Sequence, residues 1–425
     1  MTSAGPEDLA AFTARVEAWV EANLRPVDPA LYEGAFRTDL SEEEELAAVG
    51  AERALQRRLY DAGLAGLCVP RAYGGQGLTP EHQQALNRAI EGHEFPVRLQ
   101  APTFTPCLAV LLEFGTEEQK RAHVPAILRG EELWMQLLSE PGGGSDVAGA
   151  LTTAVRDGDQ WVLNGSKIWT TGAWWSDWGL CLARTNWDVP KHRGLTVFML
   201  PLRRAGVDIH RIEMLNGSRE FCQEFFTDVV VPDTDRVGDV DEGWTVGVRW
   251  MFYERLLYET PLVTFPSGLS RTFIRSSYAE LARAAGRGHD PAAQELVGEA
   301  RMLDVAFEVL QERIALGVRT GRISDQAAAV ARLFKGVTAG RTRTIAFELA
   351  GMTGGVWTAD DGPLAERGVE YLMRQAGSIG GGTTEMARNV ISERVLGMPR
   401  ERAGDRDIPF REVPRAPSSP PSGLP

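Results

Sequence analysis

The first third of the chain carries apolar residues at helical spacing. Residues 7–25 place them three or four positions apart, which predicts an amphipathic helix. The residues of its apolar face are Leu9, Phe12, Val16 and Val20. Further helices are expected over residues 41–62, 81–92, 105–114 and 117–129. The sequence before residue 133 is therefore expected to be helical.

From about residue 133 the pattern changes to an alternation of apolar and polar positions, with many β-branched and aromatic residues, which is typical of strands. Strands are predicted over residues 151–156, 160–164, 178–184, 195–201, 206–212 and 221–231. Between two strand-like runs, Asn164-Gly165 is expected to form a tight hairpin turn. The pattern indicates a compact β domain between two helical blocks.

Helical spacing resumes at about residue 242. Helices are predicted over residues 268–285, 291–321, 324–352, 363–377 and 383–396, with Pro261 and Pro266 expected to interrupt the start of this block. Residues 401–425 contain six prolines and little to bury, so we expect a tail that is disordered or draped on the surface.

The fold class expected from this order is α+β, mainly α. Its expected parts are an N-terminal helical domain over residues 1–132, a middle β domain over 133–240, a C-terminal helical block over 241–400 and a proline-rich tail over 401–425. A chain of 425 residues is long enough for two or three such domains.

The composition argues against several classes of protein. The formal net charge of −13 argues against a nucleic-acid binder, although a few local arginines would suffice for an anionic substrate. The four cysteines show no CxxC spacing and are expected to be reduced, in a cytoplasmic protein. There is no apolar run that predicts membrane insertion. The six histidines show no ligand spacing, so no metal site is expected.

The candidate chemistry begins at Gln136. Three consecutive glycines, Gly142 to Gly144, allow backbone N–H groups to approach an anion closely, and Ser145 adds a hydroxyl donor. Further on, Trp169 offers a flat apolar face, and Thr171 lies on the same face of a strand. These groups suit a planar cofactor that carries phosphate. The alternative is a glycine-rich turn followed by a tryptophan of the core.

Two motifs in this stretch, SEPGGGSD at residues 139–146 and KIWTTGA at 167–173, resemble the flavin-binding segment of the acyl-CoA dehydrogenase family. Three more segments resemble family segments in the expected order: LAGLCVPRAYGGQG at 64–77, KHRGL at 191–195, and 376–400, which ends in ISERVLGMPR. The resemblance implies the acyl-CoA dehydrogenase fold, with a C-terminal four-helix bundle.

The resemblance also implies FAD as cofactor. Ser139 should bind the pyrimidine edge of the flavin, Trp169 should pack on its ring system and Thr171 should donate to N5. Ser145 should contact a phosphate of the cofactor or of coenzyme A. The other cofactor contacts implied by the resemblance are Gln136, Leu138, Arg287, Glu348, Thr383 and Glu385.

Some of these contacts imply an oligomer, because in the family they reach the flavin of a neighbouring subunit. The expected assembly is a homo-oligomer, either a dimer or a tetramer, or a heterotetramer. For Arg287 and Glu348 the alternative is that both are solvated surface residues.

The catalytic base departs from the common family pattern. Many members carry a glutamate in the loop before the final helix, where this chain has Gly381. The backbone N–H groups at Gly381 and Gly382 could still bind the thioester carbonyl. A second family position for the base falls on Glu254, at helical spacing from Val246, Trp250 and Leu257. The alternative for Glu254 is a structural ion pair with an arginine.

The resemblance therefore implies an FAD-dependent acyl-CoA dehydrogenase that forms a trans-2-enoyl-CoA. Glu254 would remove the α-proton while hydride passes from Cβ to flavin N5, and an electron-transfer flavoprotein would then accept the electrons. Arg255 matches a family contact to coenzyme A, with a solvated arginine as the alternative. The rival interpretations are a scaffold subunit of a heteromeric dehydrogenase, and a flavin-dependent oxidase or monooxygenase on the same fold. A DNA-associated relative is disfavoured by the acidic charge.

Overall fold

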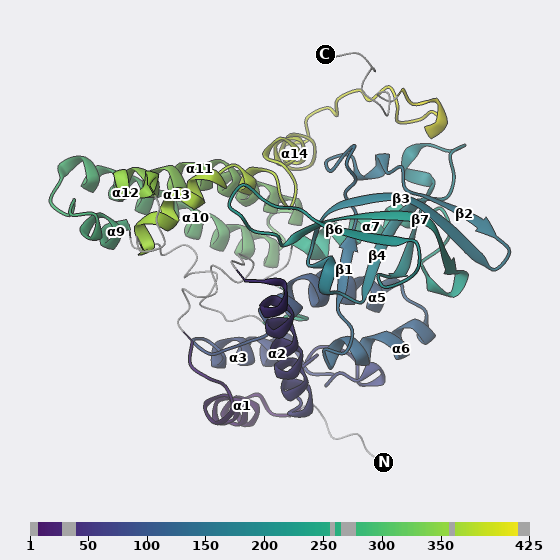
Figure 1. The fold of residues 1–425 in the computed structure, drawn as a ribbon, viewed down its shortest axis with the longest axis horizontal. Coiled ribbons are helices and arrows are strands. Elements are labelled where there is room, and N and C mark those ends of the chain that lie inside the picture. The colour runs from purple at the N-terminus through teal and green to yellow at the C-terminus, as the bar shows by residue number, and fades with distance from the viewer. Residues whose placement is uncertain (1–6, 28–39, 256–259, 265–277, 357–361, 415–425) are drawn as a thin grey trace.

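The structure is a computed structural model that describes residues 7–27, 40–255, 260–264, 278–356 and 362–414 (Figure 1). Figure 1 shows three parts, with the first helices on one side of a sheet and the later helices extending away as a separate limb. The fold is α+β and mainly helical, as expected from the sequence.

The N-terminal helices follow the predicted ranges closely. They are α1 (Leu9–Asn23), α2 (Glu42–Asp61), α3 (Pro80–Ala89), α4 (Val97–Leu99), α5 (Leu108–Phe114) and α6 (Glu117–Leu128), with a π-helical stretch at Gln100–Cys107. In α1 the Asp8 side chain caps the N-terminus, and Phe12, Val16 and Val20 are buried. Leu9 is 38% exposed, so the expectation that it shares the buried face is wrong.

The sheet has eight strands in the described residues. They are β1 (Trp134–Leu137), β2 (Thr153–Asp157), β3 (Gln160–Thr171), β4 (Trp178–Arg184), β5 (Leu195–Pro201), β6 (Val207–Arg211), β7 (Phe221–Pro232) and β8 (Arg236–Val237). The strand order is β6-β7-β3-β2-β4-β5-β8, and β1 pairs with β4 in parallel. Six of these strands were predicted, whereas β1 and β8, the two shortest, were not.

The tight turn predicted at Asn164-Gly165 is wrong. Strand β3 runs through both residues and is bulged between Leu163 and Gly165, and the chain reverses at Gly158, with φ +64°. Gly165 has φ +147°, and a Cβ there would lie 2.7 Å from the Cα of Thr152. The glycine is therefore required by a close approach of β3 to the backbone before β2.

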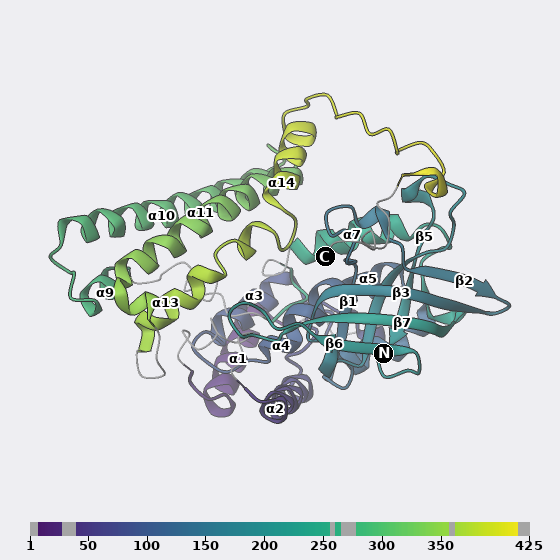
Figure 2. The same cartoon turned by 45° about the horizontal axis from the view of Figure 1, so that its top comes forward.

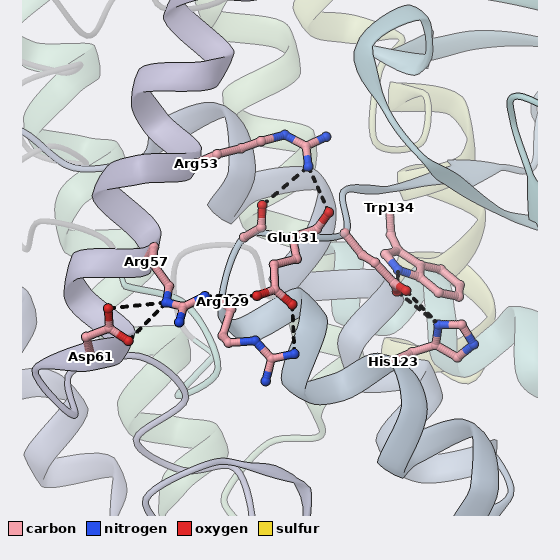
Figure 3. A network of polar contacts seen from close by, with 9 residues as sticks. Arg53, Arg57, Asp61, His123, Arg129, Glu131 and Trp134 are labelled. Atoms are coloured by element: carbon pink, nitrogen blue, oxygen red, sulfur yellow. Dashed lines mark hydrogen bonds and ion pairs between the residues drawn. The ribbon is translucent and has the colours of Figure 1, made fainter.

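A polar network joins the N-terminal helices to the start of the sheet (Figure 3). Arg53 of α2 donates to the backbone carbonyl of Glu131 (Nη1–O 2.8 Å), and Arg57 forms an ion pair with the Glu131 carboxylate (2.9 Å). On the other side of the network, the indole N–H of the buried Trp134 donates to Glu132 (2.9 Å). These contacts fix the beginning of β1, which leads into the candidate site.

The C-terminal block is helical. Its elements are α7 (Gly243–Arg255), α9 (Tyr278–Ala284), α10 (Pro291–Arg319), α11 (Ala328–Ala350), α12 (Met352–Gly355), α13 (Gly362–Leu372) and α14 (Thr384–Val390), followed by a π-helical turn at Ile391–Val395. Helices α9, α10, α11 and α13 pack together around small and aliphatic side chains such as Ala300 and Leu349. Residues 265–277, with Pro266, lie outside the described residues, and Pro261 lies in a turn.

The tail over 401–414 drapes over the β domain, which is one of the two alternatives that we expected. Phe410 is buried there, and residues 415–425 lie outside the described residues. Across the described residues, no helix has both the length and the apolar character needed to cross a membrane.

Candidate active site

The glycine-rich turn lies between β1 and β2 and is closed by two backbone hydrogen bonds between Glu140 and Gly143 (N–O 3.3 and 3.0 Å). The backbone N–H groups of Gly142, Gly144 and Ser145 have no hydrogen-bond partner within the described residues. Around Gly142 a Cβ would meet no atom within 4 Å. The turn therefore presents several free N–H donors on an open surface, an arrangement that binds anions.

A buried ion pair holds this turn against β3. The Lys167 ammonium lies 2.9 Å from Oε1 of Glu140 and also donates to the carbonyl of Leu138 (3.1 Å). Glu140 accepts two further hydrogen bonds, from the backbone N–H groups of Leu151 (2.6 Å) and Thr152 (2.9 Å). Burial acts to raise the pKa of Glu140, but the Lys167 charge and these hydrogen bonds outweigh it and lower the pKa.

The sequence analysis missed this pair. Its signal was a lone lysine within a strand, at a position that alternation assigns to the buried face. A lysine buried there needs a carboxylate partner, and the glutamate of the SEPGGGSD motif supplies it.

Trp169 is the extra residue of a β-bulge. The pairing of β3 with β7 shifts between Ile168 and Thr170, and Trp169 has φ +67°, an unfavourable conformation for a bulky residue. Trp169 is 52% exposed, and among the described residues its ring meets only that of Phe221, edge-on at 5.8 Å. The alternative that Trp169 belongs to the core is therefore wrong. Strain at an exposed aromatic residue is typical of a ligand site.

Four predicted cofactor contacts flank the turn and the bulge. Leu138 and Ser139 follow β1 directly, Ser145 lies in the turn, and Thr171 is the last residue of β3. The hydroxyl groups of Ser139, Ser145 and Thr171 make no hydrogen bond within the described residues. They remain available to a ligand.

Helix α7 carries Glu254 next to this region. Trp250 is fully buried one turn before it, and its indole N–H donates to Oε1 of Gln136 in β1 (2.9 Å). Glu254 is half-buried. Leu257, expected on the same face, and the side chain of Arg255 lie outside the described residues.

Arg249 fixes the outer side of α7. Its guanidinium pairs with Glu113 of α5 (Nε–Oε1 2.9 Å) and donates to the Tyr253 hydroxyl (2.9 Å). This arginine, five positions before Glu254, is therefore engaged by another carboxylate.

The structure brings Arg287 and Glu348 together in the C-terminal block. Arg287 donates to the backbone carbonyl of Glu348 (Nη1–O 2.6 Å) and pairs with Asp290 (2.8 Å), and the Glu348 carboxylate lies 3.5 Å from Arg341. Both side chains keep part of their surface exposed. Glu348 lies near the end of α11, and Arg287 lies between α9 and α10; in Figure 1 these helices are set apart from strands β1 and β2.

The loop before α14 carries the remaining predicted contacts. Gly381 and Gly382 have φ +69° and +95°, and a Cβ at either would meet no atom within 4 Å. Thr383 caps α14 by accepting from the N–H of Met386 (3.1 Å). Glu385 is exposed, pairs with Arg388 (3.2 Å), and lines a cavity of ≈ 370 Å³ between α11 and α14.

The predicted residues thus fall into three groups by element. One group lies on β1, β3, the glycine-rich turn and α7, a second joins the N-terminal side of α10 to the end of α11, and a third precedes α14. No group of three or more His, Cys, Asp or Glu side chains able to hold a metal ion occurs in the described residues.

Comparison with known proteins identifies the family of this chain. Family models of the acyl-CoA dehydrogenase N-terminal, middle and C-terminal domains match residues 6–131, 136–229 and 242–396. The chain belongs to the acyl-CoA dehydrogenase family. Members of this family are FAD-dependent oxidoreductases.

Several named relatives match nearly the full chain. Acyl-CoA dehydrogenase IpdE1 of Mycobacterium tuberculosis is 33% identical over 94% of this chain and 100% of its own length. Among solved structures, the Tcur3481-Tcur3483 steroid ACAD has a TM-score of 0.70 and 25% identity, over 94% of this chain and 100% of the other. The ChsE4-ChsE5 complex from Mycobacterium tuberculosis has a TM-score of 0.67 at 23% identity, over 94% and 100%, which shows the shared fold.

The residues of this acyl-CoA dehydrogenase fit FAD. The free N–H groups of the turn suit phosphate, the exposed Trp169 suits a planar ring, and the unpartnered hydroxyl groups of Ser139 and Thr171 suit the polar edge of a flavin. When bound, FAD would supply an acceptor for two electrons.

Proposed function

We propose that this protein removes two hydrogens from Cα and Cβ of an acyl-CoA thioester, forming a trans-2-enoyl-CoA, with Glu254 as the base. The observation that carries the proposal is the position of Glu254. It is a half-buried carboxylate on α7, one turn after a tryptophan that hydrogen-bonds β1 at the start of the flavin segment. The reaction is an oxidation of the kind that opens a β-oxidation cycle.

Glu254 removes the α-proton as hydride leaves Cβ. This proton is acidic enough to be removed only if the thioester oxygen is stabilised as negative charge develops on it. The N–H groups of Gly381 and Gly382 are suited to this role, because both residues have positive φ and neither carries a side chain. Gly381 also supports Glu254 as the base, because a glycine there leaves no carboxylate at the other family position.

The chain's own residues bind and orient the reactants. The turn at Gly142–Ser145 holds phosphate, Ser139, Gln136 and Leu138 border the flavin, and Thr171 donates to its N5 edge. Arg255 binds coenzyme A.

Arg287, Glu348, Thr383 and Glu385 act on the flavin of a neighbouring subunit. An oligomer is supported by the apolar side chains that the C-terminal block exposes, among them Val309 (49%), Val337 (55%) and Met352 (83%). A homotetramer and a heterotetramer would both supply the neighbouring subunit. A heteromer is the second candidate, because the name of the Tcur3481-Tcur3483 steroid ACAD joins two proteins and the ChsE4-ChsE5 neighbour is named a complex.

The substrate class and electron acceptor are also proposed. A neighbour at 25% identity is named a steroid ACAD, so a steroid-derived acyl-CoA belongs beside straight-chain acyl-CoAs as a candidate substrate. An electron-transfer flavoprotein is the proposed acceptor. The four free cysteines, three of them buried, fit a reducing, cytoplasmic location.

The test is an anaerobic titration of the purified protein with a panel of acyl-CoAs, following the flavin absorbance. Loss of the oxidised flavin spectrum with one class of acyl-CoA supports the proposal and names the substrate class. A flavin-loaded protein that no member of the panel reduces contradicts it. A protein that retains flavin only with a co-expressed second subunit would favour the heteromer, and rapid reaction of the reduced flavin with oxygen would favour an oxidase or monooxygenase.

A further inference from the structure

The last described residues form a strap, defined as residues 399–413, which runs from the end of the C-terminal helices to the β domain. Figure 2 shows it crossing from the α14 region to the far end of the sheet. There the backbone N–H groups of Phe410 and Arg411 donate to the carbonyls of Val189 (2.9 Å) and Trp187 (3.0 Å), and Arg411 forms an ion pair with Asp188. The strap is therefore docked by its backbone as well as by its side chains.

Phe410 packs on an arginine that holds the chain after the glycine-rich turn. Its ring is buried, stacks on Trp187 at 5.4 Å, and lies 3.9 Å from the guanidinium carbon of Arg184. Arg184 is fully buried and donates to the carbonyls of Ala148 (2.5 Å) and Ala150 (3.2 Å). The segment that follows the turn is thus fixed by an arginine that the strap covers.

A second connection reaches the turn itself. The Lys191 ammonium lies 2.8 Å from a carboxylate oxygen of Asp146, the last residue of the SEPGGGSD motif, and 2.8 Å from one of Asp405 in the strap. The Lys191 side chain is only 13% exposed. Because water is partly excluded from its ammonium group, its ion pairs with Asp146 and Asp405 are stronger than those of a fully exposed lysine. Asp405 and Asp146 together fix the position of one lysine.

We propose that the strap is a positioning element for the phosphate-binding turn, with Asp405 acting through Lys191 and Phe410 acting through Arg184. By holding both ends of the segment from Asp146 to Ala150, the strap orients the free N–H groups of the turn toward the phosphate groups of a nucleotide. Both FAD and coenzyme A carry such groups. The inference rests on the proposed function only in that the turn binds one of these nucleotides.

The proposal also connects two parts of the site. The strap follows the π-helical turn Ile391–Val395, which continues α14, and ends on the β domain. It therefore links the C-terminal helices to the segment that follows the phosphate-binding turn.

The experiment compares Asp405→Asn with Asp407→Asn in the full chain. Asp407 is an exposed residue of the same strap and serves as the matched control. Two readouts distinguish the nucleotides: the Kd of the apoprotein for FAD, from flavin fluorescence, and the KM and kcat for acyl-CoA. We expect Asp405→Asn to raise the FAD Kd or the acyl-CoA KM roughly three- to fivefold with kcat unchanged, and Asp407→Asn to leave both unchanged.

Two further variants separate positioning from general stability. Asp405→Glu, which keeps the charge, should restore most of the affinity. The double variant Asp405→Asn with Lys191→Gln should bind no more weakly than Lys191→Gln alone, because both act through one bridge. Equal behaviour of Asp405→Asn and Asp407→Asn, additive effects in the double variant, or equal loss in Asp405→Asn and Asp405→Glu would each overturn the proposal. The FAD measurement needs no turnover, so it stands if the proposed dehydrogenation fails.

Discussion

Lys167 and Glu140 form a buried ion pair, with 2.9 Å between Nζ and Oε1, that joins the two halves of the candidate flavin site. Lys167 precedes the bulge that carries Trp169, and Glu140 opens the turn that carries Gly142 to Ser145. The Lys167 side chain has no exposed surface. The pair acts together with the hydrogen bonds from Lys167 to the Leu138 carbonyl (3.1 Å) and from the Ile168 N–H to the Ser139 carbonyl (3.0 Å).

Replacing Lys167 with Met should destabilise the protein strongly. It leaves the Glu140 carboxylate buried without its cation, a change that costs about 3–5 kcal/mol. The control is Arg121→Met, which removes an exposed pair with Glu117 at 3.4 Å and should cost less than about 1 kcal/mol. The thermal unfolding midpoint of the apoprotein measures both. A midpoint for Lys167→Met as high as that of the control would contradict this account.

Replacing Glu254 with Gln should abolish reduction of the flavin by substrate while the protein still binds FAD. The amide keeps the size of the side chain but cannot accept the α-proton, so a loss of at least about a hundredfold in rate is expected. Anaerobic stopped-flow absorbance measures this rate. Glu17→Gln, at an exposed position on α1, is the control and should react normally. Near-normal reduction in Glu254→Gln would remove Glu254 from the mechanism.

Trp169→Ala should weaken FAD binding without destabilising the apoprotein. The side chain is half-exposed, so its removal costs little packing, whereas loss of stacking should raise the FAD Kd by about tenfold. Trp169→Gly should make the apoprotein more stable by up to about 1 kcal/mol, because glycine adopts φ +67° without strain. Phe225→Ala, an exposed aromatic of β7, is the control for FAD binding. A large loss of apoprotein stability in Trp169→Ala would assign the residue to the core.

The long helices were predictable because their apolar spacing repeats over many turns. Helix α10, expected over residues 291–321, is observed at Pro291–Arg319. The turn expected at Asn164-Gly165 was not observed, because the sequence shows a glycine but not the backbone of Thr152 that it must accommodate. Strand β1, of four residues, is too short for any alternation to reveal it.

In the candidate site, sequence motifs point to the proposed ligand contacts, such as Ser139 and Trp169, but not to the residues that support them. The bridge from Lys191 joins positions 45 and 214 residues away, and no local pattern reports such a contact. For the Glu140–Lys167 pair, which spans 27 residues, alternation marks Lys167 as buried but does not identify its partner.

Glu224 provides a prediction about pH. This carboxyl of β7 is fully buried, accepts from the Thr170 hydroxyl (3.0 Å), and has a second oxygen with no hydrogen-bond partner in the described residues. Burial raises its pKa from 4.5 to about 8, against the opposing effects of the Thr170 hydrogen bond and the Lys167 charge. At neutral pH the folded protein therefore holds a proton here that the unfolded chain has released.

The sign of the effect follows from proton binding. Between pH 4.5 and about 8 the folded state binds more protons at Glu224 than the unfolded state, so this group makes the protein less stable as pH rises. Over the interval from pH 4.5 to pH 7 the loss amounts to roughly 3 kcal/mol. Glu224→Gln cannot titrate, so its stability relative to the wild type should improve by about that amount across the interval, whatever its offset at pH 4.5.

Thermal unfolding of the apoprotein at a series of pH values measures this difference. The comparison uses the change in the difference between variant and wild type, since the buried amide of Glu224→Gln brings its own constant cost. Glu213→Gln, at an exposed position, should show no such change with pH and serves as the control. If the difference between Glu224→Gln and the wild type stays constant from pH 4.5 to pH 7, Glu224 is ionised in the folded protein and burial does not control its protonation.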